Sequence, residues 1–190
     1  FEPNKNTVVK NNLNKKSLCV VIASNKYAYE SNELYSARFR TIKWFEDNHP
    51  NNLDLYGLGW DINLFSHNFI LKPLNKFQNY NLYKKIFKRN LKVYKGYVKD
   101  KIECLSSYKF SICYENAIWP GYVTEKIFDC FYAGTVPIYL GAPNITRYID
   151  KKCFIDRRDF NSDKSLYEFI INLSNQKYSE YLKNAQQFLN

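Results

Sequence analysis

Three polar side chains are expected in the first turn of a helix that the sequence predicts over Tyr122–Ala133. At the helical angular step Tyr122, Glu125 and Lys126 fall on the polar face, opposite an apolar face, and Gly134 closes the helix. The first turn of a helix carries unpaired backbone N–H groups and the positive end of the dipole, which attract anions. A lysine beside these amides is suited to hold a phosphate. The alternative is a solvated polar face on which the glutamate only complements the dipole.

A second cation is expected at the start of an earlier helix, which reaches Asn48 and takes Ser36 as its N-cap. Arg38 then lies in the first turn, on the apolar side of that helix. An inward-facing arginine needs a partner, and no carboxylate occurs at helical spacing on that face. A diphosphate would be a suitable partner because guanidinium binds phosphate oxygens in pairs. The alternative is an arginine whose head reaches water along apolar surface.

The elements that must position these residues alternate between strand and helix. Helices are also expected over 101–107 and around Leu166–Leu173 and Tyr178–Ala185, whereas 61–80 shows no clear element. This alternation predicts a three-layer α/β domain with a mainly parallel sheet, whose ligand lies beyond the carboxyl ends of the strands. The loop Glu115–Gly121 occupies such a place. The expected strands are Ser17–Ser24, Leu53–Tyr56, Tyr108–Tyr114, Thr135–Leu140 and Cys153–Asp156.

Length and composition indicate one domain. The chain has 190 residues, enough for one sizeable core, and 45% of them are hydrophobic. Residues 1–16 are rich in Asn and Lys and predict a linker or arm, so the folded domain is expected over 17–190. The sequence contains no Met, even at position 1, which suggests a piece of a longer protein.

The charge balance points to an anionic partner. Lys and Arg number 28 against 18 acidic residues, a net charge of +10. The partner could be an anionic ligand, a membrane surface or nucleic acid. The basic run Tyr83–Lys95 is typical of a solvated helix face, with membrane or polyanion contact as the alternative. No aromatic RNA-binding signature or helix-turn-helix pattern supports nucleic acid.

The five cysteines form no CxxC pair and no cluster with histidine, so no metal site is expected. Cys19, Cys113 and Cys130 fall within apolar patterns, which favours small buried hydrophobes in a reducing compartment.

Two motifs follow one another in this part of the chain, YKFSICYEN (108–116) and GYVTEKIFDCFYAGTVPIYLGAP (121–143). Together they resemble the donor-binding signature of the α1,3/α1,4-fucosyltransferases, glycosyltransferase family 10. The resemblance extends through VVIASN (20–25), SARFR (36–40) and DLYG (54–57), and covers about 17–160. It implies that the chain is the C-terminal, Rossmann-like half of a two-domain GT-B enzyme, with an N-terminal acceptor domain outside this chain.

The resemblance also implies roles for six residues of the donor site. One arginine and one lysine would contact the diphosphate of GDP-fucose, and a glutamate would bind the ribose. An asparagine and a tyrosine would line the site, and a second glutamate belongs to the motif without a definite role. The arginine is Arg38, the lysine is Lys126, and the glutamate of the ribose is Glu125. The asparagine and the tyrosine are Asn116 and Tyr122, and the second glutamate is Glu115.

The implied chemistry is inverting transfer of fucose from GDP-fucose to a glycan hydroxyl. Two fixed cations and a helix N-terminus would stabilise the departing GDP without a metal or other cofactor. The general base is expected in the N-terminal domain, so this chain alone should bind GDP-fucose without turnover. The alternatives are a GT-B transferase for another GDP-sugar, a non-catalytic module binding an anionic surface or nucleic acid, and an inactive homologue. The composition suggests a bacterial protein of the cytoplasm, for which contact with the inner face of the membrane is an open alternative. If the source is eukaryotic, the expected location is the Golgi lumen.

Overall fold

The computed structural model describes residues 17–63, 72–77 and 81–190, so the predicted arm over 1–16 lies outside the described residues. The centre is a six-stranded sheet in the order β3-β2-β1-β4-β5-β6, and every pairing is parallel. The order reverses between β1 and β4, which is where ligands of such sheets bind. The strands are β1 Ser17–Ile22, β2 Leu53–Tyr56, β3 Tyr94–Gly96, β4 Tyr108–Tyr114, β5 Val136–Leu140 and β6 Ile155–Asp156.

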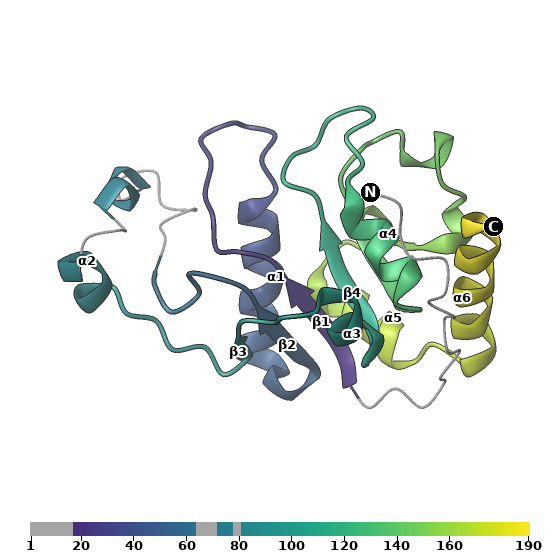
Figure 1. Cartoon of the computed structure of the whole chain (residues 1–190), viewed down its shortest axis with the longest axis horizontal. Helices are drawn as coiled ribbons and strands as arrows, with labels where there is room; N and C mark the ends of the chain where they lie inside the picture. The colour runs from purple at the N-terminus through teal and green to yellow at the C-terminus, as the bar shows by residue number, and fades with distance from the viewer. Residues whose placement is uncertain (1–16, 64–71, 78–80) are drawn as a thin grey trace.

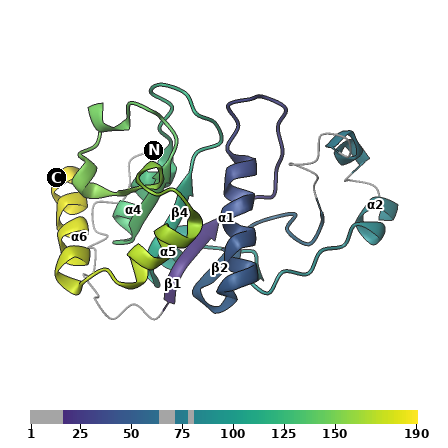
Figure 2. The ribbon, with the colours of Figure 1, turned by 180° about the vertical axis from the view of Figure 1, so that it is seen from behind.

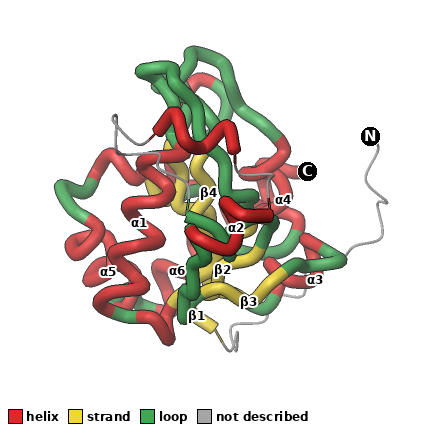
Figure 3. Tube along the Cα trace, turned by 90° about the vertical axis from the view of Figure 1, so that its left-hand side faces the viewer, coloured by secondary structure: helices red, strands yellow, loops and turns green. Residues whose placement is uncertain are grey.

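Helices cover both faces of this sheet (Figures 1 and 2). The side view separates helix, sheet and helix into three layers (Figure 3), so the predicted α/β Rossmann-like fold is confirmed. One face carries α1 Tyr35–Asn48 and α5 Asp163–Ile171, and the other carries α3 Lys101–Ser106 and α4 Glu125–Tyr132. The remaining α-helices are α2 Asn81–Ile86 and α6 Asn175–Leu189, and 3₁₀ turns span Pro50–Asn52, Lys72–Phe77, Ile145–Arg147, Lys151–Cys153 and Arg157–Asp159.

The two faces of the sheet have separate cores. Along β4, Phe110, Ile112 and Tyr114 belong to the core beneath α1 and α5. Cys113 belongs to the core beneath α3 and α4. Both sets of side chains are buried because a parallel sheet is covered on both faces. Successive residues at the end of β4 therefore lead to opposite sides of the molecule.

Several predicted boundaries are wrong by a few residues. Helix α1 begins at Tyr35 with Leu34 as its N-cap, so Ser36 lies inside it. Helix α4 begins at Glu125, because Thr124 is the extended N-cap residue and Gly121 has φ of +77°. The Pro120–Gly121 turn thus reaches further than the apolar pattern indicated. Strand β1 ends at Ile22, and β6 is only two residues long because Lys151–Cys153 is a 3₁₀ turn.

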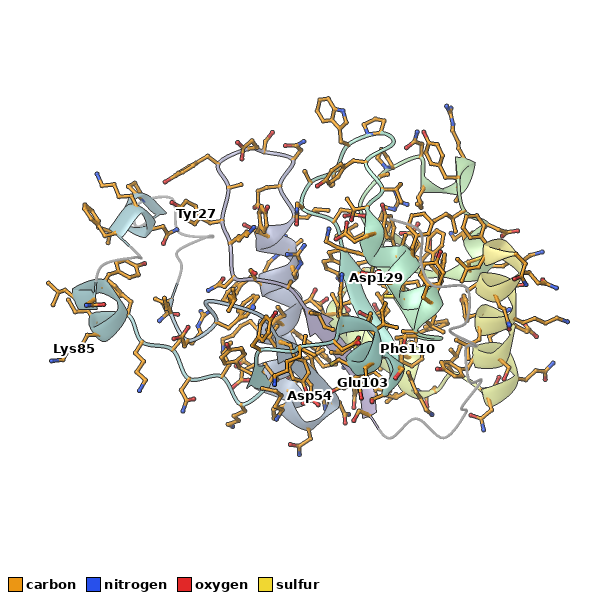
Figure 4. All side chains as sticks on the ribbon, viewed as in Figure 1. Tyr27, Asp54, Lys85, Glu103, Phe110 and Asp129 are labelled. Atoms are coloured by element: carbon orange, nitrogen blue, oxygen red, sulfur yellow. The ribbon has the colours of Figure 1, made fainter. Side chains whose placement is uncertain are left out.

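The helical interpretation of the basic run Tyr83–Lys95 is wrong. Only its beginning belongs to α2, and its end enters β3, a strand that the sequence did not predict. Val93 is fully buried and Leu91 is 9% exposed. The short edge strand therefore forms because these apolar side chains pack on the domain, although the lysines around them are exposed. Figure 4 shows Lys85 at the outer end of α2, away from the sheet.

The cysteines are free thiols. Cys19, Cys113, Cys130 and Cys153 are buried and Cys104 is half-buried, as small hydrophobic side chains would be. Burial raises the pKa of Cys153 to about 11. Within residues 17–63, 72–77 and 81–190, no group of His, Cys, Asp and Glu could hold a metal ion. Among the described helices, none combines the length and the apolar character that crossing a membrane needs.

Candidate functional site

Two loops meet at the point where the strand order reverses. The loop after β1 leads into α1, and the loop after β4 leads into α4; both emerge at the same edge of the sheet (Figure 1). Backbone hydrogen bonds join them, from Leu34 N to Asn116 O at 2.8 Å and from Ile118 N to Asn32 O at 2.7 Å. The N-termini of α1 and α4, the two predicted anion-binding helices, are therefore held side by side.

Arg38 connects these loops from within. Its side chain is 4% exposed on the apolar side of α1, as predicted. Nη2 donates to the carbonyl oxygens of Tyr114 at 2.7 Å and Glu115 at 2.9 Å, with a longer 3.5 Å contact to Asn116 Oδ1. Burial lowers the pKa of Arg38. The partner of this inward arginine is thus the end of β4.

The other nitrogens of the Arg38 guanidinium remain for a ligand. All three hydrogen bonds come from Nη2, and neither Nη1 nor Nε donates to any residue that the structure describes. A guanidinium has five N–H donors in a fixed plane, so a fixed Nη2 sets the direction of the rest. The arginine is therefore positioned before any anion arrives.

Glu115 follows β4 directly and is fully buried. Its Oε1 accepts from Thr124 N at 2.9 Å, and its Oε2 accepts from Thr124 Oγ1 at 2.7 Å and Lys126 Nζ at 2.9 Å. Lys126 Nζ also contacts Thr124 Oγ1 at 2.9 Å, and its side chain is 20% exposed. The carboxylate thus fixes both the entrance of α4 and the direction of its lysine. This gives Glu115 a positioning role that the sequence left open.

The first turn of α4 remains open to an anion. Thr124 is the N-cap residue, but its hydroxyl contacts Glu115 and Lys126 and makes no cap to the helix amides. Such amides favour a negative ligand. An ammonium group has three donors, and Lys126 uses two of them. One N–H of Lys126 and the first amides of α4 therefore form a common surface for phosphate oxygens.

The remaining predicted residues surround this surface in different ways. Asn116 is half-buried and holds the two loops together through its carbonyl oxygen. Glu125 is the first residue of α4 and is exposed. Tyr122 precedes the helix by three residues, so the expectation that it opens the helix is wrong; its ring is 36% exposed. All six predicted residues lie on the first turn of α1, at the end of β4 or at the entrance of α4.

Three positioning residues were missed by the sequence interpretation. Thr124 connects Glu115 to Lys126, and Asn144 Oδ1 accepts from Gly121 N at 2.8 Å. A Cβ at Gly141 would lie 2.5 Å from Glu115 Cγ, so only glycine leaves room for this carboxylate. Thr124 and Gly141 both lie within the motif at 121–143, so their place in that motif could have marked them as residues of the site. Nothing in the chain marks Asn144 as the partner of a turn 23 residues earlier.

The parallel sheet, its reversal point and its covering helices define a Rossmann-like α/β domain. Residues 63–189 match the family model of the glycosyltransferase family 10 (fucosyltransferase) C-terminal domain. The chain therefore belongs to glycosyltransferase family 10, as the sequence motifs predicted. Arg38 lies outside the matched stretch, whereas the other five predicted residues lie within it.

Curated relatives include enzymes from a bacterium and from mammals. The chain is 42% identical over 91 residues to the α-(1,3)-fucosyltransferase FucT of Helicobacter pylori, a match covering 47% of this chain and 18% of that enzyme. It is 36% identical over 98 residues to the human 4-galactosyl-N-acetylglucosaminide 3-α-L-fucosyltransferase 9, covering 48% of this chain and 27% of the relative. Each match spans less than a third of the relative's length.

Solved structures of an α1,3-fucosyltransferase share the fold. The structure with GDP has a TM-score of 0.60 at 24% identity and covers 90% of this chain and 38% of that one. The structure with GDP-fucose has a TM-score of 0.58 at 26% identity, covering 90% and 39%. The chain therefore corresponds in fold to a little over a third of that enzyme.

Proposed function

We propose that this chain is the donor-binding part of a fucosyltransferase that transfers fucose, with inversion, from GDP-fucose to a glycan hydroxyl. The observation that carries the proposal is that Arg38 and Lys126 both bind Glu115 at the reversal point of the sheet, beside the uncapped start of α4. Family membership and the likeness to a fucosyltransferase solved with GDP-fucose support it.

Within this proposal, the two cations stabilise the charge that GDP gains as it departs. Lys126 directs its third N–H, and Arg38 its Nη1 and Nε, toward the diphosphate. Both are held by protein partners before the ligand binds, so little reorganisation is needed when charge develops. The exposed carboxylate of Glu125 is placed to accept from ribose hydroxyls, and Asn116 and Tyr122 line the site.

The proposed reaction uses no metal, because the cations and the helix amides supply the positive charge. The acceptor hydroxyl still needs a base within hydrogen-bond reach. We assign that base and most acceptor contacts to an N-terminal domain outside residues 17–190, the range we assign to the donor-binding domain.

Calorimetric titration with GDP tests the phosphate assignment. Lys126→Ala should weaken GDP binding at least about tenfold, which corresponds to about 1.4 kcal/mol. The matched control is Lys164→Ala on α5, whose side chain is 73% exposed, and it should bind as wild type does. Unchanged affinity in Lys126→Ala would reject the assignment.

Titrations with GDP-fucose, GDP-mannose and a short RNA separate the competing functions. The proposal requires GDP-fucose to bind at least as tightly as GDP-mannose, and requires GDP to displace it. Tighter binding of GDP-mannose would favour another GDP-sugar. RNA binding that GDP does not displace, in the absence of GDP-fucose binding, would favour the non-catalytic module.

A further inference from the structure

A polar pocket lies on the side of β4 that faces away from α4, between the sheet and helices α1 and α5. Its volume is about 240 Å³. The pocket begins where β4 and β5 end and extends to the turn after β6. Its lining residues are Ala37, Arg40, Thr41, Tyr114, Leu140, Arg157, Arg158 and Asp163.

Three guanidinium groups and one carboxylate line this pocket. Arg157 donates to Phe160 O at 2.7 Å and to Asp163 Oδ1 at 3.2 Å. Arg158 binds Asp156 through Nε at 2.8 Å and Nη2 at 2.7 Å. These ion pairs neutralise two of the three arginines.

Arg40 is the third arginine and is exposed on α1. It makes no hydrogen bond or ion pair with any residue in the described part of the chain. Arg158 Nη1 likewise donates to no described residue. The pocket therefore retains a positive charge and guanidinium donors that the protein itself does not use.

Two buried hydroxyl groups form the inner wall. Thr41 Oγ1 donates to Asp163 Oδ1 at 2.9 Å and lies 3.2 Å from the hydroxyl of Tyr114. Burial raises the pKa of Tyr114, so its hydroxyl stays neutral at physiological pH. The carboxylate of Asp163 is thus held by Thr41 and Arg157, which limits its repulsion of an incoming anion.

The pocket is separate from the donor site proposed above. Tyr114 packs in the core beneath α1 and α5, whereas Glu115 turns to the opposite side and holds the entrance of α4. None of the six candidate donor residues lines the pocket. Its volume also lies below the range of about 300–1,000 Å³ usual for drug-sized ligands. A compact ligand fits it better than a nucleotide.

We propose that this pocket binds a small phosphate-bearing molecule, with Arg40 and Arg158 as the principal donors. Guanidinium groups are suited to phosphate because their planar donors match its oxygens in pairs. The shared chemistry is a phosphate dianion, free or carried by a compact phosphomonoester such as a hexose phosphate. The proposal goes beyond donor binding and holds whether or not the chain binds GDP-fucose.

Calorimetric titration with inorganic phosphate, in the presence of saturating GDP, tests this site. Wild type should bind phosphate, and Lys126→Ala should bind it equally well, since Lys126 is not part of the pocket. Arg40→Gln should weaken binding at least about fivefold. The matched control is Lys43→Gln, an exposed cation on the same helix outside the pocket lining. Because both substitutions are on the exposed surface of α1, loss of folding is not expected to obscure the result.

A parallel titration with glucose 6-phosphate identifies the source of the phosphate. Tighter binding than inorganic phosphate would support a phosphomonoester, and equal or weaker binding would support free phosphate. The proposal is overturned if wild type binds neither ligand, if Arg40→Gln binds as wild type does, or if Lys43→Gln weakens binding as much as Arg40→Gln. If phosphate binding is lost when GDP is present, or is lost in Lys126→Ala, the phosphate occupies the donor site instead. The donor site is tested separately by titrating Lys126→Ala with GDP alone.

Discussion

At the scale of single residues, the candidate site depends on a carboxylate that no ligand is expected to touch. Glu115 is fully buried and accepts from three donors, and one of these is the lysine proposed to bind phosphate. A cation that remains at a protein surface loses side-chain entropy when a ligand fixes it. Because Glu115 has already fixed Lys126, much of that entropy is lost during folding rather than during binding.

Glu115→Gln should therefore reduce stability as well as donor affinity. Removing one partner of a fully buried pair costs about 3–5 kcal/mol. Since Lys126 is 20% exposed, we expect a smaller loss of about 2–3 kcal/mol in the free energy of unfolding by urea. Glu125→Gln is the control, as it removes an exposed carboxylate one residue from Lys126, and it should change stability by less than about 0.5 kcal/mol. Equal effects of the two substitutions would contradict the role of Glu115.

The buried thiols predict a loss of stability in alkali. The pKa of Cys153 is raised from 9.0 to about 11 by burial, so the unfolded chain releases this proton at lower pH than the folded chain. Its contribution is complete below pH 9.0 and is lost as the pH rises toward about 11. The slope is at most about 1.4 kcal/mol per pH unit for this group.

Urea unfolding of wild type and Cys153→Ala at several pH values between about 8 and about 10.5 measures this slope. Cys153→Ala lowers stability at every pH by removing packed atoms, so the comparison concerns the slope alone. We expect a shallower fall for the variant above about pH 9. Parallel curves for the two proteins would show that Cys153 does not titrate in this way.

The sequence predicted the position of Arg38 but not its partners. The helical projection placed it on the apolar side of α1, and it is buried there. Its hydrogen bonds go to backbone carbonyl oxygens 76 and 77 residues away. Every residue has a carbonyl group, so residue types carry no signal for such a partner.

At the scale of elements, apolar periodicity predicted which segments pack but not where each begins. The apolar residues Ile127, Cys130 and Phe131 are buried on α4, as expected. The start of α4 differs because Glu115, which follows β4 and lies nine residues earlier in the chain, binds the amide of Thr124. Strand β3 escaped prediction because it is three residues long and lies at the edge of the sheet, among lysines.

The close approach of the chain just after β1 and just after β2 provides an element-scale test. Gly57 has φ of +136°, and a Cβ there would lie 2.0 Å from Ala23 O, which also accepts from Trp60 Nε1 at 2.6 Å. Gly96 has φ of +94° with open space around it. Gly96→Ala should cost about 1–2 kcal/mol through backbone strain alone. Gly57→Ala adds a clash between the two strand ends and should cost about 3 kcal/mol or more.

Thermal and urea unfolding compare the two glycine variants directly. A larger loss for Gly57→Ala would show that close approach of the strand ends adds to the conformational cost there. Equal losses would assign the whole cost to the positive φ values. If Gly57→Ala gives too little folded protein for unfolding curves while Gly96→Ala folds, the order of the two costs is still established.

At the scale of the whole molecule, the proposed donor groups all lie at one edge of one domain. Arg38 and the entrance of α4 provide positive charge on that edge. Of the two carboxylates among the six candidate donor residues, Glu115 has no free access to solvent and is engaged by three donors, and Glu125 is assigned to the ribose. Neither is therefore available as the base that an acceptor hydroxyl needs.

Residues 1–190 should accordingly bind GDP-fucose without transferring fucose. The physical reason is that two positioned cations suffice for diphosphate binding, whereas transfer also needs a base and an oriented acceptor. A radiolabelled GDP-fucose assay with a range of glycan acceptors measures transfer, and calorimetry on the same sample confirms that the donor binds. Glu125→Gln serves as an internal check, since it should weaken GDP-fucose binding through the ribose while binding of inorganic pyrophosphate stays as in wild type. Fucose transfer by wild-type residues 1–190 would contradict the prediction and mean that the base lies within this chain. If Glu125→Gln abolished that transfer even at saturating GDP-fucose, the base would be Glu125 rather than a group of an outside domain.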